Sequence, residues 1–283
     1  ARRFGGELQR LDTDPATPGR AAIIRRFPLG PVLGISPFNF PLNLVAHKVA
    51  PAIAVGAPVI VKPSPRTPLS ALLLGEILAE TALPAGALSV LPVGVEQTLA
   101  LVGDPRLPIV TFTGSDVVGF DIANRAPRKK VVLELGGDAA AVVCADYGSK
   151  EDLAWVAQRV ATFAMYQAGQ SCISVQRLLI AQELAEQLIP LVVEQVKGLG
   201  GGSSSNPGEL VGPVIDEASA QRIVDWTDEA VAAGAQLLCG GSRDGTFVEP
   251  TVLRDIPEST PLGCNEAFGP VLGIRTFQTD DEA

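Results

Sequence analysis

Short apolar segments alternate with helical segments through the first half of this 283-residue sequence. Residues 32–35, 57–61 and 109–113 are apolar and suit strands, whereas 42–54 and 69–81 suit helices. When strands and helices alternate along a chain, each helix crosses over to another parallel strand of one sheet. The pattern predicts an α/β fold with a Rossmann-like parallel sheet and helices on both faces. Further strands are expected at 88–91, 131–134 and 141–144, and further helices at 97–102 and 116–124.

The second half of the sequence predicts another α/β domain. Helices are expected at 153–165, 184–197 and 218–233, and a strand at 176–181. Domains typically hold about 100–200 residues, so a chain of 283 residues suits two, at 29–136 and 137–283. A Gly- and Ser-rich stretch at 200–207 has the composition of a linker, but we expect a surface loop inside the second domain.

Two extended stretches near the start of the chain predict a β-hairpin. Residues 6–11 and 21–27 flank a segment rich in proline and glycine at 12–19, which favours a turn. With its lead-in, the hairpin occupies residues 1–28. An isolated two-stranded ribbon is marginal in water and its edges pair readily with another chain. We therefore expect a homodimer or homotetramer joined through this hairpin.

Charge and cysteine content exclude several classes of protein. A net charge of -9 and a pI near 4.7 argue against nucleic-acid binding, which needs a concentrated basic surface. One histidine and four scattered cysteines give neither a zinc spacing nor a disulfide framework, so we expect no metal site and a reducing cytoplasm. Apolar runs end well before membrane-spanning length, so no membrane partner is expected.

One cysteine and one glutamate stand in sequence contexts suited to catalysis. Cys172 follows Gly-Gln-Ser, and Glu134 follows an apolar strand and precedes Leu-Gly-Gly. A thiolate can add to the carbonyl carbon of an aldehyde, and a carboxylate can activate the water that hydrolyses the resulting thioester. The other cysteines, Cys144, Cys239 and Cys264, are expected to be small buried hydrophobic residues.

Several separated motifs occur together in one order. They are 36–41 around Asn39, 59–64 around Lys62, 112–119 with its two glycines, 132–137, 169–172, and 266–270. In this combination the sequence resembles the aldehyde dehydrogenase superfamily. The resemblance implies oxidation of an aldehyde to a carboxylic acid with NAD(P)+, through a cysteine hemithioacetal and a thioester. It also implies that 29–136 is part of a cofactor domain, that 137–283 is part of a catalytic domain, and that the chain is incomplete at both ends.

The resemblance assigns roles around the nucleophile. The amide of Asn39 and the backbone N–H of Cys172 would form an oxyanion hole, although an asparagine in this context can also simply cap a turn. Glu134 would be the general base for deacylation, and its position at a strand end predicts a partly apolar cleft around it. A strand-end glutamate on the surface is the alternative.

Phosphate binding needs backbone N–H groups at a helix N-terminus and close approach without side chains. Gly114, Ser115 and Gly119 meet that need, although the chain lacks the Gly-x-Gly-x-x-Gly dinucleotide fingerprint. The resemblance further implies that Glu266 holds the nicotinamide-side ribose and that Phe268 packs near the nicotinamide ring. Lys62, with Ser64 in the same motif, would contact the adenosine ribose.

The cofactor loop favours tolerance of NADP. Family members that prefer NAD often carry a glutamate three residues after the lysine, where this sequence has Pro65. Pro65 has no carboxylate to repel a 2′-phosphate, and Arg66 follows it directly with a positive charge. A 2′-phosphate would therefore be tolerated or preferred. Arg66 is alternatively a solvated loop charge.

Residues near the motifs are candidate walls of a substrate pocket. They are Asn43, Leu44, His47, Tyr166 and Ile173. A lone histidine on an apolar helix is more often structural than functional. The stretch 38–48 is similar to that of family members acting on lactaldehyde, glyceraldehyde derivatives or succinic semialdehyde. Two alternatives stay open: an acyl-CoA-forming semialdehyde dehydrogenase, and a catalytically silent structural or binding protein of the same fold.

Overall fold

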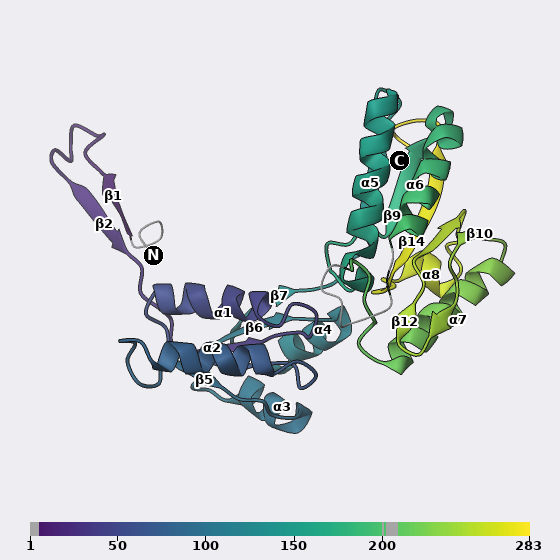
Figure 1. Ribbon diagram of the computed structural model, residues 1–283. Helices are drawn as coiled ribbons and strands as arrows, with labels where there is room; N and C mark the ends of the chain where they lie inside the picture. The colour runs from purple at the N-terminus through teal and green to yellow at the C-terminus, as the bar shows by residue number, and fades with distance from the viewer. Residues whose placement is uncertain (1–5, 200, 202–208) are drawn as a thin grey trace. The chain divides into compact units, whose positions relative to one another are not determined.

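The computed structural model describes residues 6–199, 201 and 209–283, and the chain divides into two compact units, Ala1–Leu135 and Gly136–Ala283. Each unit is built around its own sheet (Figure 1). Apart from Gly201, the predicted Gly- and Ser-rich surface loop at 200–207 lies outside the described residues. Among the residues that the structure describes, no helix combines the length and apolar character needed to cross a membrane.

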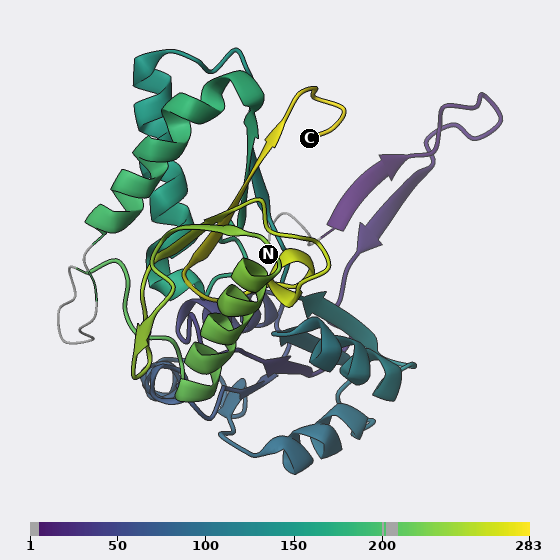
Figure 2. The same ribbon diagram turned by 90° about the vertical axis from the view of Figure 1, so that its right-hand side faces the viewer.

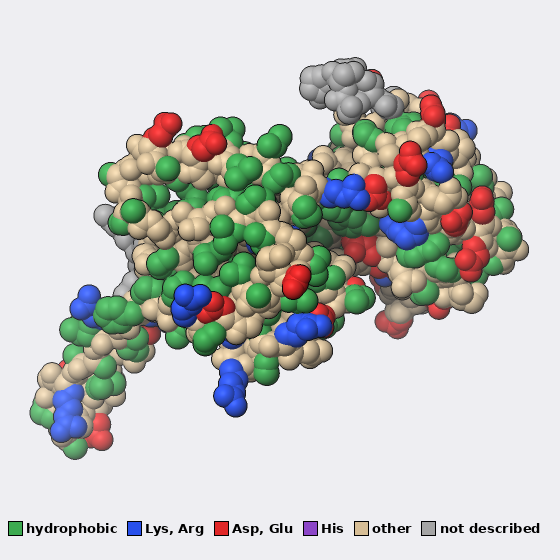
Figure 3. Space-filling model, turned by 90° about the horizontal axis from the view of Figure 1, so that it is seen from below, with side chains coloured by type: hydrophobic (Ala, Val, Ile, Leu, Met, Phe, Trp, Pro, Cys, Tyr) green, Lys and Arg blue, Asp and Glu red, His purple; other side chains and the backbone are tan. Residues whose placement is uncertain are grey.

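The first unit begins with the predicted hairpin. Strands β1 (Gly6–Arg10) and β2 (Ala21–Arg25) pair antiparallel, with Gly6 opposite Arg25. Apolar side chains lie on the surface of this ribbon (Figure 3), and Ile23 is 76% exposed. The hairpin therefore buries little apolar surface within its own chain.

The sheet of the first unit is entirely parallel, as predicted. Its strands are β3 (Val32–Ile35), β4 (Val59–Lys62), β5 (Leu88–Val90), β6 (Ile109–Thr113) and β7 (Lys130–Glu134), in the order β5-β4-β3-β6-β7. Its helices are α1 (Asn43–Ala54), α2 (Leu69–Ala79), α3 (Val95–Gly103) and α4 (Asp116–Arg125).

Alternation along the strands separates two cores on the two faces of this sheet. Val32 of β3 belongs to a buried cluster with Val45 and Val49 of α1. The next residue, Leu33, belongs to another cluster, with Val102 of α3 and Ile122 of α4. Successive strand residues point to opposite faces, so helices cover both faces, which confirms the predicted fold class.

The second unit contains a mixed sheet. Its strands are β8 (Ala140–Val143), β9 (Arg177–Ala181), β10 (Gln236–Cys239), β13 (Thr251–Arg254) and β14 (Val271–Phe277), in the order β10-β13-β14-β9-β8. Only β10 in this order runs antiparallel to its neighbour. A small ribbon is formed by β11 (Arg243–Asp244) and β12 (Phe247–Val248).

Helices pack on the second sheet. They are α5 (Lys150–Met165), α6 (Ala185–Gly198), α7 (Glu217–Ala232) and the short α8 (Pro261–Cys264), with 3-10 turns at Tyr166–Gly169 and Gln182–Leu184. Helices α5 and α6 lie side by side (Figure 2). Ser149 caps α5 by accepting the backbone N–H of Asp152 at 3.1 Å, which fixes where the helix begins.

Candidate active site

The candidate nucleophile lies in a tight turn directly after α5. This helix ends at Met165, and Gln167, Ala168 and Gly169 then have positive φ angles of 55°, 54° and 66°. Left-handed backbone costs roughly 1–2 kcal/mol at a residue with a side chain, so tertiary contacts must hold this turn. Cys172 follows and is half-buried, as a thiol at the mouth of a site would be.

Buried side chains next to Cys172 hold the turn. The hydroxyl groups of Ser171 and Tyr166 share a hydrogen bond of 2.5 Å. The side-chain oxygen of Gln170 accepts the backbone N–H of Ile215 at 2.8 Å. Ser171 and Gln170 are both buried, so breaking either bond would leave a polar group without water. The backbone around the thiol is therefore well fixed.

Two glycines allow the loop 266–270 to approach closely. A Cβ atom at Gly169 would overlap the carbonyl oxygen of Gly269, and one at Gly136 would overlap the carboxylate of Glu266. A side chain at either position would displace the loop. The loop therefore lies against both the nucleophile turn and the first residue of the second unit.

Four parallel strands of the first unit end beside a predicted site residue. Asn39 follows β3, Lys62 ends β4, Gly114 follows β6 and Glu134 ends β7. Because these strands are parallel and adjacent, the four residues gather at the carboxyl edge of the sheet, where open α/β sheets bind their ligands. Asn39 is only 5% exposed.

The surroundings of Glu134 differ from the partly apolar cleft that its sequence predicts. The residue is exposed, because it is the last residue of β7 and β7 is one of the two edge strands of its sheet. Its backbone carbonyl accepts the N–H of Gly114 at 3.1 Å, which ties the strand end to the predicted phosphate loop.

The predicted phosphate loop fits a pyrophosphate at the start of α4. A Cβ atom at Gly114 would overlap the ring of Phe112, and one at Gly119 would overlap the side chain of Leu135. Ser115 has an extended backbone at the N-cap position, and its carbonyl accepts the N–H of Gly119 at 2.9 Å. The glycines let the helix lie close to the sheet, and its N-terminal N–H groups can bind an anion.

The predicted adenosine-side residues follow β4. Lys62 is half-buried, and burial lowers the pKa of its ammonium group. Ser64 is buried, and its hydroxyl oxygen accepts the backbone N–H of Arg66 at 3.2 Å. Arg66 itself is exposed. The loop therefore presents one partly desolvated cation and one solvated cation.

The candidate pocket residues fall into two groups, one in each unit. Asn43 and His47 are exposed and Leu44 is half-buried on α1. Tyr166 and Ile173 flank Cys172 in the second unit.

The expectation that the three remaining cysteines are buried needs correction. Cys264 is exposed in the short α8 helix, and its thiol lies 3.2 Å from the carbonyl oxygen of Thr260. Cys144 and Cys239 are half-buried rather than fully buried. No group of three or more potential metal-ligating side chains gathers within residues 6–199, 201 and 209–283.

Lys48 is a buried cation that sequence reasoning missed. It is 5% exposed on α1, and its Nζ donates to Thr113 Oγ1 at 2.7 Å and lies 3.3 Å from Thr111 Oγ1. Burial lowers the pKa of Lys48 from 10.5 to about 8, and the charge of Glu134 opposes the shift. The sequence carries a signal for this burial, because Lys48 lies three residues after the buried residue Val45 and so on the same face of the helix.

Lys48 should make the stability of the protein depend on alkaline pH. Between about pH 8 and 10.5 the unfolded chain retains a proton that the folded protein has released. The free energy of unfolding therefore rises with pH, by at most about 1.4 kcal/mol per unit from this group. Urea denaturation at pH 8 to 10 should show this slope, and Lys48→Met should remove it. Lys150→Met, at an exposed site, is the control and should keep it; an equal slope in Lys48→Met contradicts the expectation.

Comparison with known proteins gives relatives over the whole chain. Residues 1–283 match the sequence model of the Aldehyde dehydrogenase family. Aspartate-semialdehyde dehydrogenase 1 of Pseudomonas canavaninivorans is 38% identical over 100% of this chain and 59% of its own length. Aldehyde dehydrogenase 21 of Physcomitrella patens, solved with the reaction product succinate, has a TM-score of 0.94 and 46% identity over 99% of this chain and 58% of that one.

A third relative was solved with a cofactor. It is the NADP-dependent glyceraldehyde-3-phosphate dehydrogenase of Bacillus halodurans C-125, complexed with NADP, with a TM-score of 0.91 and 35% identity over 99% of this chain and 58% of that one. The chain thus spans slightly less than three fifths of the length of these relatives.

Proposed function

Since the chain belongs to the aldehyde dehydrogenase family, we propose that it oxidises an aldehyde to a carboxylic acid with NAD(P)+. The observation that carries the proposal is the fixed turn that presents Cys172, in which three left-handed residues and then the buried polar side chains of Gln170 and Ser171 precede the thiol. A cysteine with only a structural role would not need a partly exposed thiol such as that of Cys172. The turn supports a nucleophile.

In the proposed reaction the Cys172 thiolate adds to the aldehyde carbon, and the carbonyl oxygen becomes an alkoxide. The side-chain amide of Asn39 and the backbone N–H of Cys172 stabilise that charge. The carbon then gives up a hydride, for which NAD(P)+, when bound, would be the acceptor. This leaves a thioester on Cys172. Glu134 takes a proton from water, hydroxide attacks the thioester, and the acid leaves as the thiolate re-forms.

Residues on this chain would hold the two ends of the cofactor separately. Gly114, Ser115 and Gly119 offer the pyrophosphate a site free of side chains, and Lys62 would contact the adenosine ribose. Glu266 would bind the nicotinamide-side ribose, and Phe268 would pack near the ring. An exposed Glu134 at the edge of its sheet is accessible to water, which favours hydrolysis over the acyl-CoA-forming alternative.

We propose an aldehyde that carries an anionic group as the substrate. The three relatives are named for aspartate semialdehyde and glyceraldehyde 3-phosphate or were solved with succinate, which all carry an acid group away from the reacting carbon. The test is a panel of short aliphatic, hydroxylated, aromatic and semialdehyde substrates with each cofactor, followed by the absorbance of reduced nicotinamide. The highest kcat/KM should belong to an anionic aldehyde. A preference for a neutral aromatic aldehyde would contradict the proposed substrate class. Absence of turnover with every aldehyde in the panel would contradict the proposed oxidation itself.

Cofactor choice provides a separate test. If Arg66 contacts a 2′-phosphate, Arg66→Ala should weaken NADP binding and spare NAD binding. A charge-assisted hydrogen bond contributes about 1.5–3 kcal/mol, which corresponds to a loss of roughly tenfold or more. Fluorescence titration with NADPH and NADH measures the ratio of Kd values. Arg128→Ala, at another exposed arginine of the same unit, is the matched control. Equal losses for both cofactors in Arg66→Ala contradict the contact.

Assembly through the hairpin and a cytoplasmic location stay predictions. The exposed apolar side chains of β1 and β2 support the first. Light scattering gives the mass in solution, and a monomer at micromolar concentration would argue against a dimer or tetramer.

A further inference from the structure

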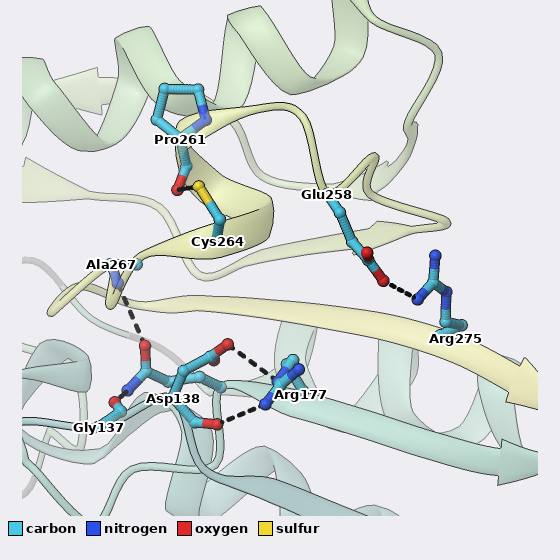
Figure 4. A network of polar contacts seen from close by, with 9 residues as sticks. Gly137, Asp138, Arg177, Glu258, Pro261, Cys264, Ala267 and Arg275 are labelled. Atoms are coloured by element: carbon cyan, nitrogen blue, oxygen red, sulfur yellow. Dashed lines mark hydrogen bonds and ion pairs between the residues drawn. The ribbon is translucent and has the colours of Figure 1, made fainter. Parts of the chain in front are cut away.

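Gln176 lies buried between two segments that flank the candidate site in the second unit. It is 7% exposed. Its Nε2 donates to the carbonyl oxygen of Gly137 at 2.5 Å, and its Oε1 accepts the backbone N–H of Ala267 at 3.1 Å (Figure 4). A side-chain amide has both donor and acceptor groups, so one residue can join a carbonyl and an N–H. Gln176 thereby links the start of the unit to the loop 266–270.

The backbone of Gln176 is fixed as well. Its N–H donates to the carbonyl oxygen of Ala139 at 3.0 Å, and its own carbonyl accepts the N–H of Gly273 in β14 at 2.9 Å. The preceding residue, Val175, donates to the carbonyl oxygen of Phe163 in α5 at 3.2 Å. The side chain therefore extends from a rigid support that also carries the nucleophile turn, four residues earlier.

Both backbone polar groups of Ala267 are held by side chains. Gln176 accepts its N–H, and Arg222 donates to its carbonyl oxygen at 2.8 Å. Ala267 is 4% exposed, so neither group has water as a substitute. Its neighbours are Glu266 and Phe268, and the φ angle of 45° at Phe268 requires a backbone held from outside.

The other end of the link is anchored too. Gly137 is followed by Asp138, whose carboxylate pairs with Arg177 at 2.9 Å while its backbone carbonyl accepts Arg177 Nη2 at 2.9 Å (Figure 4). Burial raises the pKa of Asp138, and Arg177 opposes the shift. The segment that Gln176 holds is thus fixed, and the carboxylate of Glu266 lies against its first residue, Gly136.

We propose that Gln176 is a positioning residue that sets the placement of Glu266 and Phe268 for the nicotinamide end of the cofactor, acting only through the backbone of Gly137 and Ala267. The inference rests on the proposed function. Gln176 is not expected to touch the cofactor itself.

The test uses two substitutions in the full chain. Gln176→Leu keeps a similar volume and removes both hydrogen bonds, whereas Gln176→Glu keeps the acceptor for Ala267 but sets a carboxylate oxygen against the carbonyl oxygen of Gly137. Gln176→Leu should raise the KM and the Kd of NAD(P)H or NAD(P)+ by roughly tenfold, and Gln176→Glu should raise them at least as much. Gln187→Leu, at an exposed glutamine of α6, is the matched control and should change neither.

The rate at which iodoacetamide alkylates Cys172 separates positioning from general damage. It should be the same in wild type and in both Gln176 variants. Values of Kd within twofold of wild type in Gln176→Leu overturn the inference, as does an equal loss in Gln176→Glu and Gln176→Leu accompanied by slower alkylation. If Gln176→Leu does not fold, a Kd for Gln176→Glu that equals the wild-type value overturns it. Failure of the proposed function is distinct, because wild type itself would then bind no nicotinamide cofactor.

Discussion

Cys172→Ala is expected to lower aldehyde turnover with NAD(P)+ by about a thousandfold or more, since removal of a covalent nucleophile leaves only binding and electrostatic contributions. Cofactor binding should remain, because the predicted phosphate loop around Gly114 lies in the other unit. The turn itself should survive, because its anchors Ser171 and Gln170 are unchanged. The absorbance of reduced nicotinamide at steady state measures turnover, and a fluorescence titration with NADH measures cofactor binding.

The control for this experiment is Cys144→Ala, which removes a half-buried thiol in the same unit. It should keep turnover near the wild-type value. Near-normal turnover in Cys172→Ala would exclude the thiol mechanism. A large loss in both variants would show only that the unit is sensitive to loss of a thiol.

Glu134→Gln should separate the two halves of the reaction. The thiol still adds to the aldehyde and hydride is still lost, so a burst of reduced cofactor close to one per active site is expected. Hydrolysis then lacks its base, and the steady-state rate should fall by about a hundredfold or more. Stopped-flow absorbance resolves the burst from the steady state.

Glu76→Gln, at an exposed glutamate of α2, is the matched control and should show no change. An unchanged steady-state rate in Glu134→Gln would remove this residue from deacylation. Adding coenzyme A to the wild type tests the competing reaction, because only an acyl-CoA-forming enzyme would turn over faster and release a thioester product.

The sequence predicts the first unit well because its signals are local. The central strand β3 is buried along its whole length, and helices long enough to show their own period separate the successive strands, so the ends of β3 and β6 agree with prediction to the residue. After residue 233 the signals weaken. Strands β11 and β12 have two residues each, and β10 pairs antiparallel, which no local period indicates.

The candidate site likewise has features that local motifs predict and features that depend on distant parts of the chain. Motifs place Asn39, Lys62, Gly114 and Glu134 at strand ends, and the parallel topology then gathers them at one edge. The exposure of Glu134 depends on strand order, which the sequence does not reveal. The side chain of Gln176 bonds to Gly137, which is 39 positions away in the sequence, and to Ala267, which is 91 positions away. No pattern near Gln176 could therefore predict these two contacts.

The division of the chain at Leu135 has a consequence for how such a protein can change over time. Within residues 1–283 each unit is one continuous stretch, and the boundary between them lies at Leu135. On the proposed roles, discrimination at the adenosine end is encoded before this point, while the nucleophile and the nicotinamide-side residues are encoded after it. A single recombination event between related genes could therefore exchange NAD for NADP preference and leave the reacting thiol untouched.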